Sequence, residues 1–235
     1  LVSQEAVLSS KLEGTHATIE DFINYDAGTE VSVSKDEMQE VMNYRSALYF
    51  ALGKMSTISD DSEEGRHKLP LSVRLIKEMH KILLDNVRGQ NKSPGEFKTE
   101  QNYIGNSAEI TFTPLPPELT QDYMANFEQY IHFDEVDLLV QAALIHCQFE
   151  MIHPFERYNG IIGRIIVPMM LSDIAREAKL LICLSEYLYH NKNEYFDLLR
   201  STQYSGGYIR WIKFFVNAVG EVAKKSAKLM TQYER

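Results

Sequence analysis

Residues 149–164 read FEMIHPFERYNGIIGR, a polar segment between two strongly apolar stretches. The stretches at residues 136–152 and 161–171 are apolar nearly all round. A helix without a polar face is typical of the middle of a bundle, so both are predicted to be central helices. The polar segment HPFERYNG is therefore predicted to connect two buried helices.

The rest of the chain is predicted to be mostly α, because apolar residues recur at helical spacing over long proline-free stretches. The predicted helices are residues 2–12, 18–25, a long helix capped by Ser34, then 71–84, 118–130, 136–152 and 161–171. Residues 97–113, FKTEQNYIGNSAEITFT, differ, since β-branched and aromatic residues surround Gly105-Asn106. This pattern predicts a short β-hairpin. The polar residues 56–69 are predicted to be a surface loop.

Composition excludes some classes of function. The 235 residues carry a formal net charge of −9, which argues against a nucleic-acid binder with a basic face. There is no run of 18 apolar residues, so no membrane span is expected. Cys147 and Cys183 lie in apolar contexts without metal-ligand spacing and are interpreted as buried free thiols. With no signal peptide visible, a cytoplasmic location is expected.

The segment at 149–164 also carries the residues best suited to chemistry. His153 would project from the end of one helix, and the N–H groups near Asn159 and Gly160 would open the next. A helix N-terminus with a glycine favours a phosphate, and Arg164 lies one turn further along. A base, an anion site and an arginine fit nucleotide chemistry. Spacing alone leaves alternatives open: such a histidine is more often a cap or a core hydrogen bonder, and such an arginine a structural ion pair.

The segment resembles the motif HPFx(D/E)GNGRxxR of the Fic family. Residues 94–105, PGEFKTEQNYIG, resemble the hairpin that this family calls the flap, and residues 112–131 resemble the segment after it. The C-terminal residues 184–219 also resemble the usual helices, and SSKLEG at residues 9–14 resembles the inhibitory motif (S/T)xxxE(G/N). The resemblance implies a mostly α, Fic-type helical bundle with a short β-hairpin flap.

The resemblance implies an enzyme, a protein adenylyltransferase that transfers AMP from ATP to a hydroxyl of a target protein. His153 would be the general base. Asn159, Gly160 and Arg164 would bind the nucleotide, with Arg164 on the terminal phosphate. The flap would pair with an extended target segment that presents a Ser, Thr or Tyr hydroxyl. The flap residues implied in docking are Thr99, Gln101, Asn102, Tyr103 and Ile104.

The same resemblance implies autoinhibition. Ser9 and Glu13 stand in register with the inhibitory motif, and Glu13 would pair with Arg164 and block a productive ATP pose. Without the resemblance, a solvated carboxylate before a helix-ending glycine would be the preferred interpretation of Glu13. We expect residues 1–60 to form an N-terminal helical region carrying the inhibitory helix. Residues 61–235 would form the Fic core with the C-terminal helices, in one compact unit. The family also includes homodimers, so a homodimer is carried over as an expectation.

The chain departs from the family motif at three positions. Arg157 stands where the family has its Mg²⁺-binding acid, Tyr158 replaces the first glycine, and Ile161 replaces the first arginine. Arginine offers no oxygen ligand, so a Mg²⁺ site is doubtful and no metal ligand is assigned. Either Glu156 supplies a substitute ligand, or Arg157 itself offsets phosphate charge. If the loop needs a positive φ at residue 158, Tyr158 is strained by about 1 kcal/mol or more.

These departures keep two alternatives open beside the adenylyltransferase. The first is a catalytically impaired Fic-fold module that binds a nucleotide or a peptide without transfer. The second is the reverse reaction, removal of AMP from a modified target, with Glu13 positioning a water. Three further features are interpreted as structural: His146 as a core histidine, Trp211 with its neighbouring phenylalanines as core, and the lysines at 224–225 as a solvated face.

Overall fold

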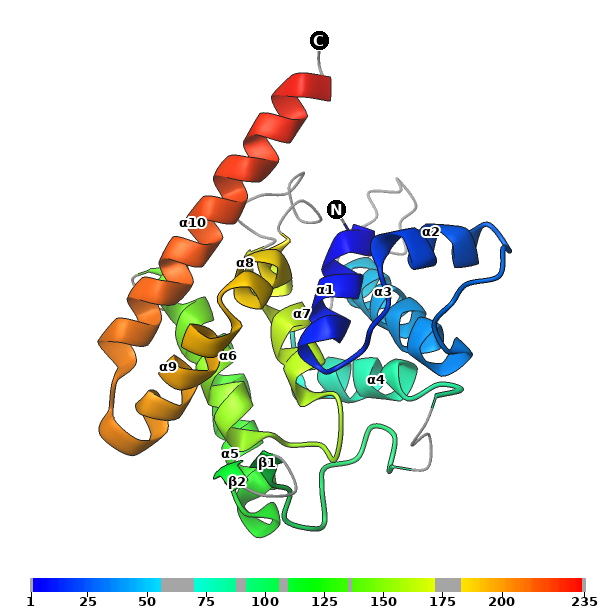
Figure 1. The fold of residues 1–235 in the computed structure, drawn as a ribbon. Helices are drawn as coiled ribbons and strands as arrows, with labels where there is room; N and C mark the ends of the chain where they lie inside the picture. Colours follow the sequence, from blue (N-terminus) through cyan, green and yellow to red (C-terminus); the bar gives the residue numbers. More distant parts are fainter. Residues whose placement is uncertain are drawn as a thin grey trace, which may run out of the picture.

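The computed structural model describes residues 2–55, 70–87, 92–105, 110–134, 137–171 and 183–233. In these ranges it is a helical bundle with one small antiparallel sheet, as predicted (Figure 1). The elements are α1 (Val2–Leu12), α2 (Ile19–Asp26), α3 (Lys35–Met55), α4 (Val73–Leu83), β1 (Ile104–Gly105), β2 (Ile110–Phe112), α5 (Pro117–Ile131), α6 (Leu138–Ile152), α7 (Asn159–Leu171), α8 (Leu184–His190), α9 (Lys192–Ser205) and α10 (Tyr208–Tyr233). The predicted loop at 56–69 and the predicted boundary at 60/61 lie outside the described residues.

The helix starts follow from capping side chains. Thr18 accepts a hydrogen bond from the Asp21 N–H, and the Asp21 carboxylate accepts one from the Thr18 N–H, which makes a capping box for α2. Ser34 caps α3 as predicted, because its hydroxyl accepts from the Glu37 N–H at 3.2 Å. Asp137 accepts from the N–H groups of residues 139 and 140. That cap places the start of α6 at Leu138.

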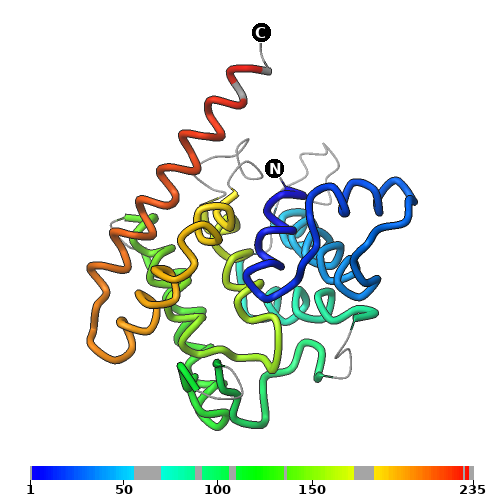
Figure 2. Tube along the Cα trace, in the orientation of Figure 1, coloured from blue at the N-terminus to red at the C-terminus, as the bar shows by residue number. Residues whose placement is uncertain are grey.

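The helix α7 lies in the centre of the bundle, and all of its residues are buried. It packs against α6, α3, α4 and α1, so the helix that precedes it and helices from the N-terminal part of the chain surround it (Figure 2). The expectation of a central helix is therefore confirmed for α7. It holds less fully for α6, where Leu144, Gln148 and Met151 are only half-buried along a surface cavity.

The first three helices pack onto the rest of the bundle. α1 contacts α8, α3 and α7, and α3 contacts α4 and α7. The long helix α10 packs against α6, α8 and α9 and extends beyond the body of the bundle at its C-terminal end (Figure 1). Trp211 and Phe215 are fully buried, as predicted for core residues. Within the described part of the chain, no helix is long and apolar enough to cross a membrane.

The predicted hairpin is present but short. β1 and β2 pair antiparallel, with Ile104 opposite Phe112 and Gly105 opposite Ile110, and a register irregularity lies between the two pairs. The predicted turn at Asn106 lies outside the described residues. Gln101 donates to the Pro114 carbonyl at 3.1 Å, which closes the hairpin at its base. The hairpin therefore lies at the end of α6 that leads into the HPFERYNG segment.

Candidate active site

The connection between α6 and α7 is a tight loop with left-handed backbone at both ends. His153 is the C-cap of α6 with φ 49° and ψ 60°, and Tyr158 has φ 61° directly before α7. Such angles cost a residue with a side chain about 1 kcal/mol each. The positive φ considered for Tyr158 is therefore present, and His153 adds a second strained position. The loop holds these conformations because other contacts fix it from both sides.

Asn159 fixes the loop from inside. Its amide donates to the Phe155 carbonyl at 2.7 Å and accepts from the Phe155 N–H at 2.8 Å, and only 1% of the residue is exposed. The side chain was predicted to help cradle phosphates, but both of its polar atoms are engaged by the loop backbone. A direct contact with a nucleotide stays a prediction, and the observed role is support of the loop.

Two residues at the base of the flap fix the loop from outside. Lys98 is 3% exposed and donates from Nζ to the Ile152 carbonyl at 3.1 Å and to Asn102 Oδ1 at 2.9 Å. Asn102 in turn donates to the Phe155 carbonyl at 3.0 Å. Burial lowers the pKa of Lys98 to about 8. The side chain of Asn102, predicted to dock a target, faces the loop, whereas Tyr103 is 58% exposed on the flap.

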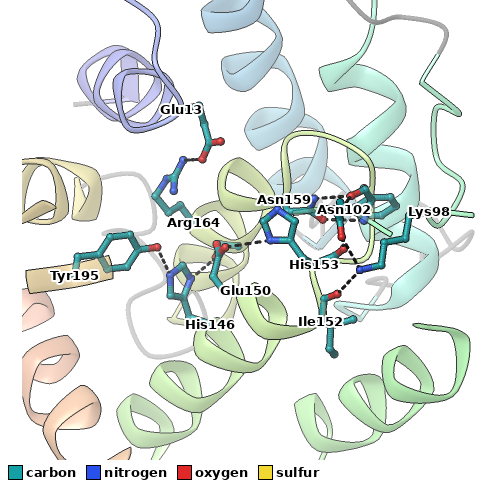
Figure 3. A network of polar contacts seen from close by, with 12 residues as sticks. Glu13, Lys98, Asn102, His146, Glu150, Ile152, His153, Asn159, Arg164 and Tyr195 are labelled. Atoms are coloured by element: carbon teal, nitrogen blue, oxygen red, sulfur yellow. Dashed lines mark hydrogen bonds and ion pairs between the residues drawn. The ribbon is translucent and has the colours of Figure 1, made fainter. Parts of the chain in front are cut away.

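The imidazole of His153 lies between α6 and the flap, with 17% of its side chain exposed (Figure 3). Its Nδ1 has no hydrogen-bond partner among the described residues, and it lies 3.7 Å from Oε2 of Glu150. Burial lowers the pKa of His153 to about 4, Lys98 lowers it further, and Glu13 opposes the shift. The ring is therefore neutral near pH 7 and can accept a proton, as a general base must.

Arg164 joins the start of α7 to the end of α1. Its Nη2 lies 2.7 Å from Glu13 Oε1, its Nε donates to the Ser9 hydroxyl at 2.7 Å, and Nη2 also donates to the Ser9 carbonyl at 3.1 Å. Only 1% of the Arg164 side chain is exposed. Burial alone would lower the pKa of Arg164, but the carboxylate of Glu13 raises it, so the arginine remains charged. The pairing of Glu13 with Arg164 that the resemblance implied is present.

Gly160 explains how the Glu13 carboxylate comes so close to α7. A Cβ at this position would collide with Glu13 Oε1 and would lie 2.9 Å from Arg164 Nη1. The carboxylate therefore lies against the first turn of α7, where unpaired N–H groups and the helix dipole favour an anion. A phosphate group would find the same partners there. The site predicted for an anion contains one, supplied by the chain itself.

The divergent positions of the loop are held by α3. Tyr158 donates its hydroxyl hydrogen to Glu40 at 3.0 Å, and Arg157 lies over the Tyr158 ring, 3.9 Å from Glu40. Glu156, considered as a substitute metal ligand, pairs with Lys92 at 3.2 Å. Within the described ranges no group of three His, Cys, Asp or Glu side chains could hold a metal. A Mg²⁺ ion at a nucleotide site is held by one or two carboxylates together with phosphates and waters, and here Arg157 offers no oxygen and Glu156 is engaged by Lys92. The doubt about a Mg²⁺ site stays a prediction.

A cavity of about 590 Å³ opens beside this loop, between the flap hairpin and α9. Its lining includes Ile104 and Phe112 from the flap, Phe196 and Arg200 from α9, and Glu150 from α6. Since Glu150 lies next to His153, the cavity adjoins the candidate base. Its aromatic and polar lining suits a flat heterocycle with polar edges.

The structure therefore brings together His153, Gly160, Arg164, Ser9 and Glu13, while Arg157 and Glu156 face other partners. Sequence reasoning missed Glu150 and Lys98. Glu150 lies three residues before His153, one helical turn away, and that spacing could have indicated it. For Lys98, the sequence offered only its position in the segment that resembles the flap as an indication that it belongs to the site. Figure 3 shows the network of polar contacts around the loop.

Of the residues interpreted as structural, His146 is fully buried in α6. Its Nδ1 lies 3.0 Å from the Gly163 carbonyl, and its Nε2 lies 2.8 Å from the Tyr195 hydroxyl. A carbonyl only accepts, so Nδ1 carries the hydrogen and Nε2 accepts from tyrosine. Burial lowers the pKa of His146 to about 4, which agrees with this neutral form. The interpretation of His146 as a core histidine is confirmed.

Comparison with known proteins gives two family matches. A sequence model of the Fic/DOC family matches residues 70–171, and a model of the Fic/DOC family N-terminal region matches residues 1–53. Among curated proteins, protein adenylyltransferase fic-1 of Caenorhabditis briggsae is 27% identical over 138 residues, covering 57% of this chain and 24% of that protein. A probable protein adenylyltransferase of Aquifex aeolicus is 23% identical over 205 residues, covering 81% and 59%.

Solved structures share the fold. A Fic family protein from Desulfovibrio desulfuricans G20 matches with a TM-score of 0.81 at 18% identity, over 97% of this chain and 65% of that one. A Fic domain containing signaling protein from Bacteroides thetaiotaomicron matches with a TM-score of 0.74 at 22% identity, over 97% and 84%. The chain thus spans about a quarter of the curated fic-1 protein that it matches, and 65% and 84% of the two solved structures.

Proposed function

Since the chain belongs to the Fic/DOC family, we propose that it transfers AMP from ATP to a hydroxyl of a target protein and that Glu13 holds this activity in check. The observation that carries the proposal is the ion pair of Glu13 and Arg164 against Gly160. The Glu13 carboxylate lies where phosphate oxygens would bind, beside a neutral histidine. This is the arrangement expected of a nucleotide site in which a carboxylate of the chain takes the place of the phosphates.

In the proposed reaction the triphosphate lies at the first turn of α7 and Arg164 holds its terminal phosphate. The target hydroxyl oxygen attacks the α-phosphorus, and the bond between that phosphorus and the bridging oxygen of the β-phosphate breaks. Pyrophosphate leaves, and the hydroxyl proton moves to Nε2 of His153. The base and ribose of ATP would occupy the cavity lined by Glu150, Phe196 and Arg200. Positioning of this kind supplies most of the rate in phosphoryl-group chemistry.

No step of this mechanism is assigned to a metal. Arg157 stands where the family has an acidic ligand, and Glu156 pairs with Lys92. The Arg157 guanidinium remains the charged group of the loop best suited to offset phosphate charge, although Glu40 now holds it at 3.9 Å. Reaching a phosphate would require this contact with α3 to rearrange.

The target is proposed to dock along the flap, where backbone hydrogen bonds suit an extended segment. A second cavity of about 930 Å³ lies at the base of the flap, lined by Gln101, Pro114, Tyr123, Phe133 and Met151 among others. Tyr123 and Phe133 are 46% and 60% exposed, so this surface offers apolar contacts to side chains of the target. The proposed division into an N-terminal inhibitory region and a Fic core is compatible with the two separate family matches.

A specific observation favours one alternative, a module that binds a nucleotide without transferring it. Tyr158 and Arg157 are both held by Glu40 of α3, so the loop of this chain is tied to its neighbour by residues that the family motif lacks. Such a loop would accept a nucleotide and yet restrict the movements that transfer needs. The module and the enzyme differ in turnover and not in binding.

The test uses ATP labelled on its α-phosphate, incubated with the protein alone and with cell lysate. Glu13→Gly should label protein strongly, the unaltered chain weakly, and the double variant Glu13→Gly with His153→Ala not at all. Parallel reactions with Mg²⁺, with Mn²⁺ and with a chelator report on metal use. No label in any reaction, together with calorimetric binding of ATP to Glu13→Gly, would establish the binding module in place of the enzyme.

A further inference from the structure

We propose that Glu150 is a positioning residue for His153, and that its carboxylate accepts the Nδ1 hydrogen of the imidazole and leaves Nε2 free to take a proton. The proposal rests on the proposed function, because it assigns Nε2 to the reaction. It does not follow from the motif HPFx(D/E)GNGRxxR, since Glu150 lies before the first residue of that motif. Three observations around α6 and α7 support it.

The first observation is the pairing of two unsatisfied atoms. Glu150 and His153 occupy the last turn of α6 at a spacing of three residues, with 12% and 17% of their side chains exposed. Glu150 Oε1 and His153 Nδ1 are both buried without a hydrogen-bond partner among the described residues. Oε2 lies 3.7 Å from Nδ1, about 1 Å beyond hydrogen-bond length. A small rotation of either side chain would bring Oε2 within bonding distance of Nδ1 and satisfy the ring nitrogen, whose present unpaired state is costly because it is buried.

The second observation is that α7 leaves room for this carboxylate. A Cβ at Gly163 would lie 2.7 Å from Glu150 Oε1 and 3.4 Å from the ring of His146. Glycine is therefore required at residue 163 for the carboxylate to lie where it does. His146 cannot serve as its partner, because Nδ1 of that ring donates to the Gly163 carbonyl and Nε2 accepts from Tyr195. His153 Nδ1, 3.7 Å from Oε2, remains available as a partner.

The third observation is the charge around the pair. Burial raises the pKa of Glu150 to about 7, Arg164 from α7 opposes the rise, and Glu13 from the end of α1 adds to it. On the histidine, burial lowers the pKa, Glu13 raises it, and Lys98 at the flap base lowers it. Displacement of Glu13 by a nucleotide would change the charge facing both groups.

The proton balance is simple. When the target hydroxyl attacks, its proton moves to Nε2 and the ring becomes an imidazolium, while Nδ1–H remains bonded to the Glu150 carboxylate. The carboxylate takes up no proton. It stabilises the positive ring that forms in the transition state and orients Nε2 toward the hydroxyl. The competing acceptor for Nδ1–H is the main-chain carbonyl of Glu150, which also raises the pKa of His153. Substitution of Glu150 removes its carboxylate and leaves its main-chain carbonyl, and so distinguishes these two acceptors.

The experiment follows the His153 ring by NMR in protein labelled with ¹⁵N-histidine, assigned by comparison with His153→Ala. Glu150→Gln keeps the size and an acceptor oxygen but removes the charge, and Glu150→Met removes both. The matched control is Glu78→Gln on the surface of α4. We expect the Nδ1–H form in the unaltered chain and in Glu150→Gln, with a pKa about one unit lower in the glutamine variant. Glu150→Met should also lose the preference for Nδ1–H.

A second readout is AMP transfer in the Glu13→Gly background. Glu150→Met should lower kcat about 100-fold with little change in the KM for ATP, and Glu150→Gln should retain more of it. The proposal is overturned if tautomer and pKa are the same in all three proteins, because the main-chain carbonyl would then be the acceptor. An Nε2–H form in the unaltered chain overturns it even if neither variant folds. Absence of transfer in every protein would refute the proposed function, while the NMR result would still decide the role of Glu150.

Discussion

Replacement of Glu13 by glycine should open the anion site and weaken the fold at the same time. The contact to be removed joins Glu13 Oε1 to Arg164 Nη2 at 2.7 Å. Two unit charges at this distance attract by roughly 4–6 kcal/mol at an effective dielectric constant near 20. The Glu13 side chain is 33% exposed, and solvent screening and side-chain ordering reduce the net contribution to about 1–3 kcal/mol.

The same contact must break before a phosphate can bind Arg164, so its loss should appear in nucleotide affinity. At 1.4 kcal/mol for each factor of ten, Glu13→Gly should bind ATP about 10- to 100-fold more tightly than the unaltered chain. AMP lacks the terminal phosphate that Arg164 is proposed to hold, and its affinity should change much less. The free energy of unfolding should fall by about 1–3 kcal/mol without nucleotide, because the buried Arg164 loses the carboxylate with which it is paired.

Calorimetric titration with ATP and AMP measures the affinities, and urea unfolding with and without ATP measures stability. Glu30→Gly is the matched control, since Glu30 is an exposed loop glutamate and its replacement carries the same entropic cost of glycine. Saturating ATP should restore the stability that Glu13→Gly loses. Equal ATP affinity in the unaltered chain and in a folded Glu13→Gly variant would refute the idea that Glu13 occupies the phosphate position.

Three further predictions concern the loop and its surroundings. Gly160→Ala should expel the Glu13 carboxylate and also exclude a phosphate, so ATP binding by calorimetry should stay at or below the unaltered level; tighter binding would contradict the shared site. Asn159→Ala should lower the free energy of unfolding by about 2–3 kcal/mol in urea, because two buried hydrogen bonds are lost, and a change below 0.5 kcal/mol would show that the loop holds itself. Burial lowers the pKa of His80 to about 4, so the unfolded chain binds more protons between about pH 4 and 6.5 and stability is lost as pH falls through that window. Urea unfolding should show that His80→Gln removes up to about 3 kcal/mol of this loss; a pH profile equal to that of the unaltered chain would contradict it.

The sequence was sufficient for the elements, because helices and hairpins follow from local patterns. Apolar periodicity placed the bounds that it gave for α1 to α7 to within about two residues, and the differences arise at caps. The helices α8, α9 and α10 were expected only from the family resemblance, without bounds. Thr18, for example, belongs to the cap of α2 and not to the helix. The fully apolar stretch that became α7 had no polar face to expose, so its burial in the centre could be predicted. The likeness of separate motifs to one family added the fold and the pairing of Glu13 with Arg164.

The site was less predictable, because its side chains are oriented by neighbours far away in the sequence. Asn102 and Asn159 look equally suited to a target or a phosphate, yet both bind the Phe155 backbone once the flap packs on the loop. No local pattern shows that Glu40 of α3 holds Tyr158 and Arg157, a contact across 118 residues in the case of Tyr158. The partner of each of these side chains depends on which polar groups are buried next to it and therefore lack water as a partner.

The chain by itself therefore determined most of the helical segments, the loop proposed to carry the chemistry and the family to which the protein belongs, since these depend on spacing and residue type. Only the tertiary structure decided that the Glu13 carboxylate occupies the first turn of α7 and that Glu150 faces His153 without a hydrogen bond. The physical reason is that burial removes water as a partner. A buried polar group must then bind whatever the packing brings within about 3 Å, and packing is a property of the whole fold.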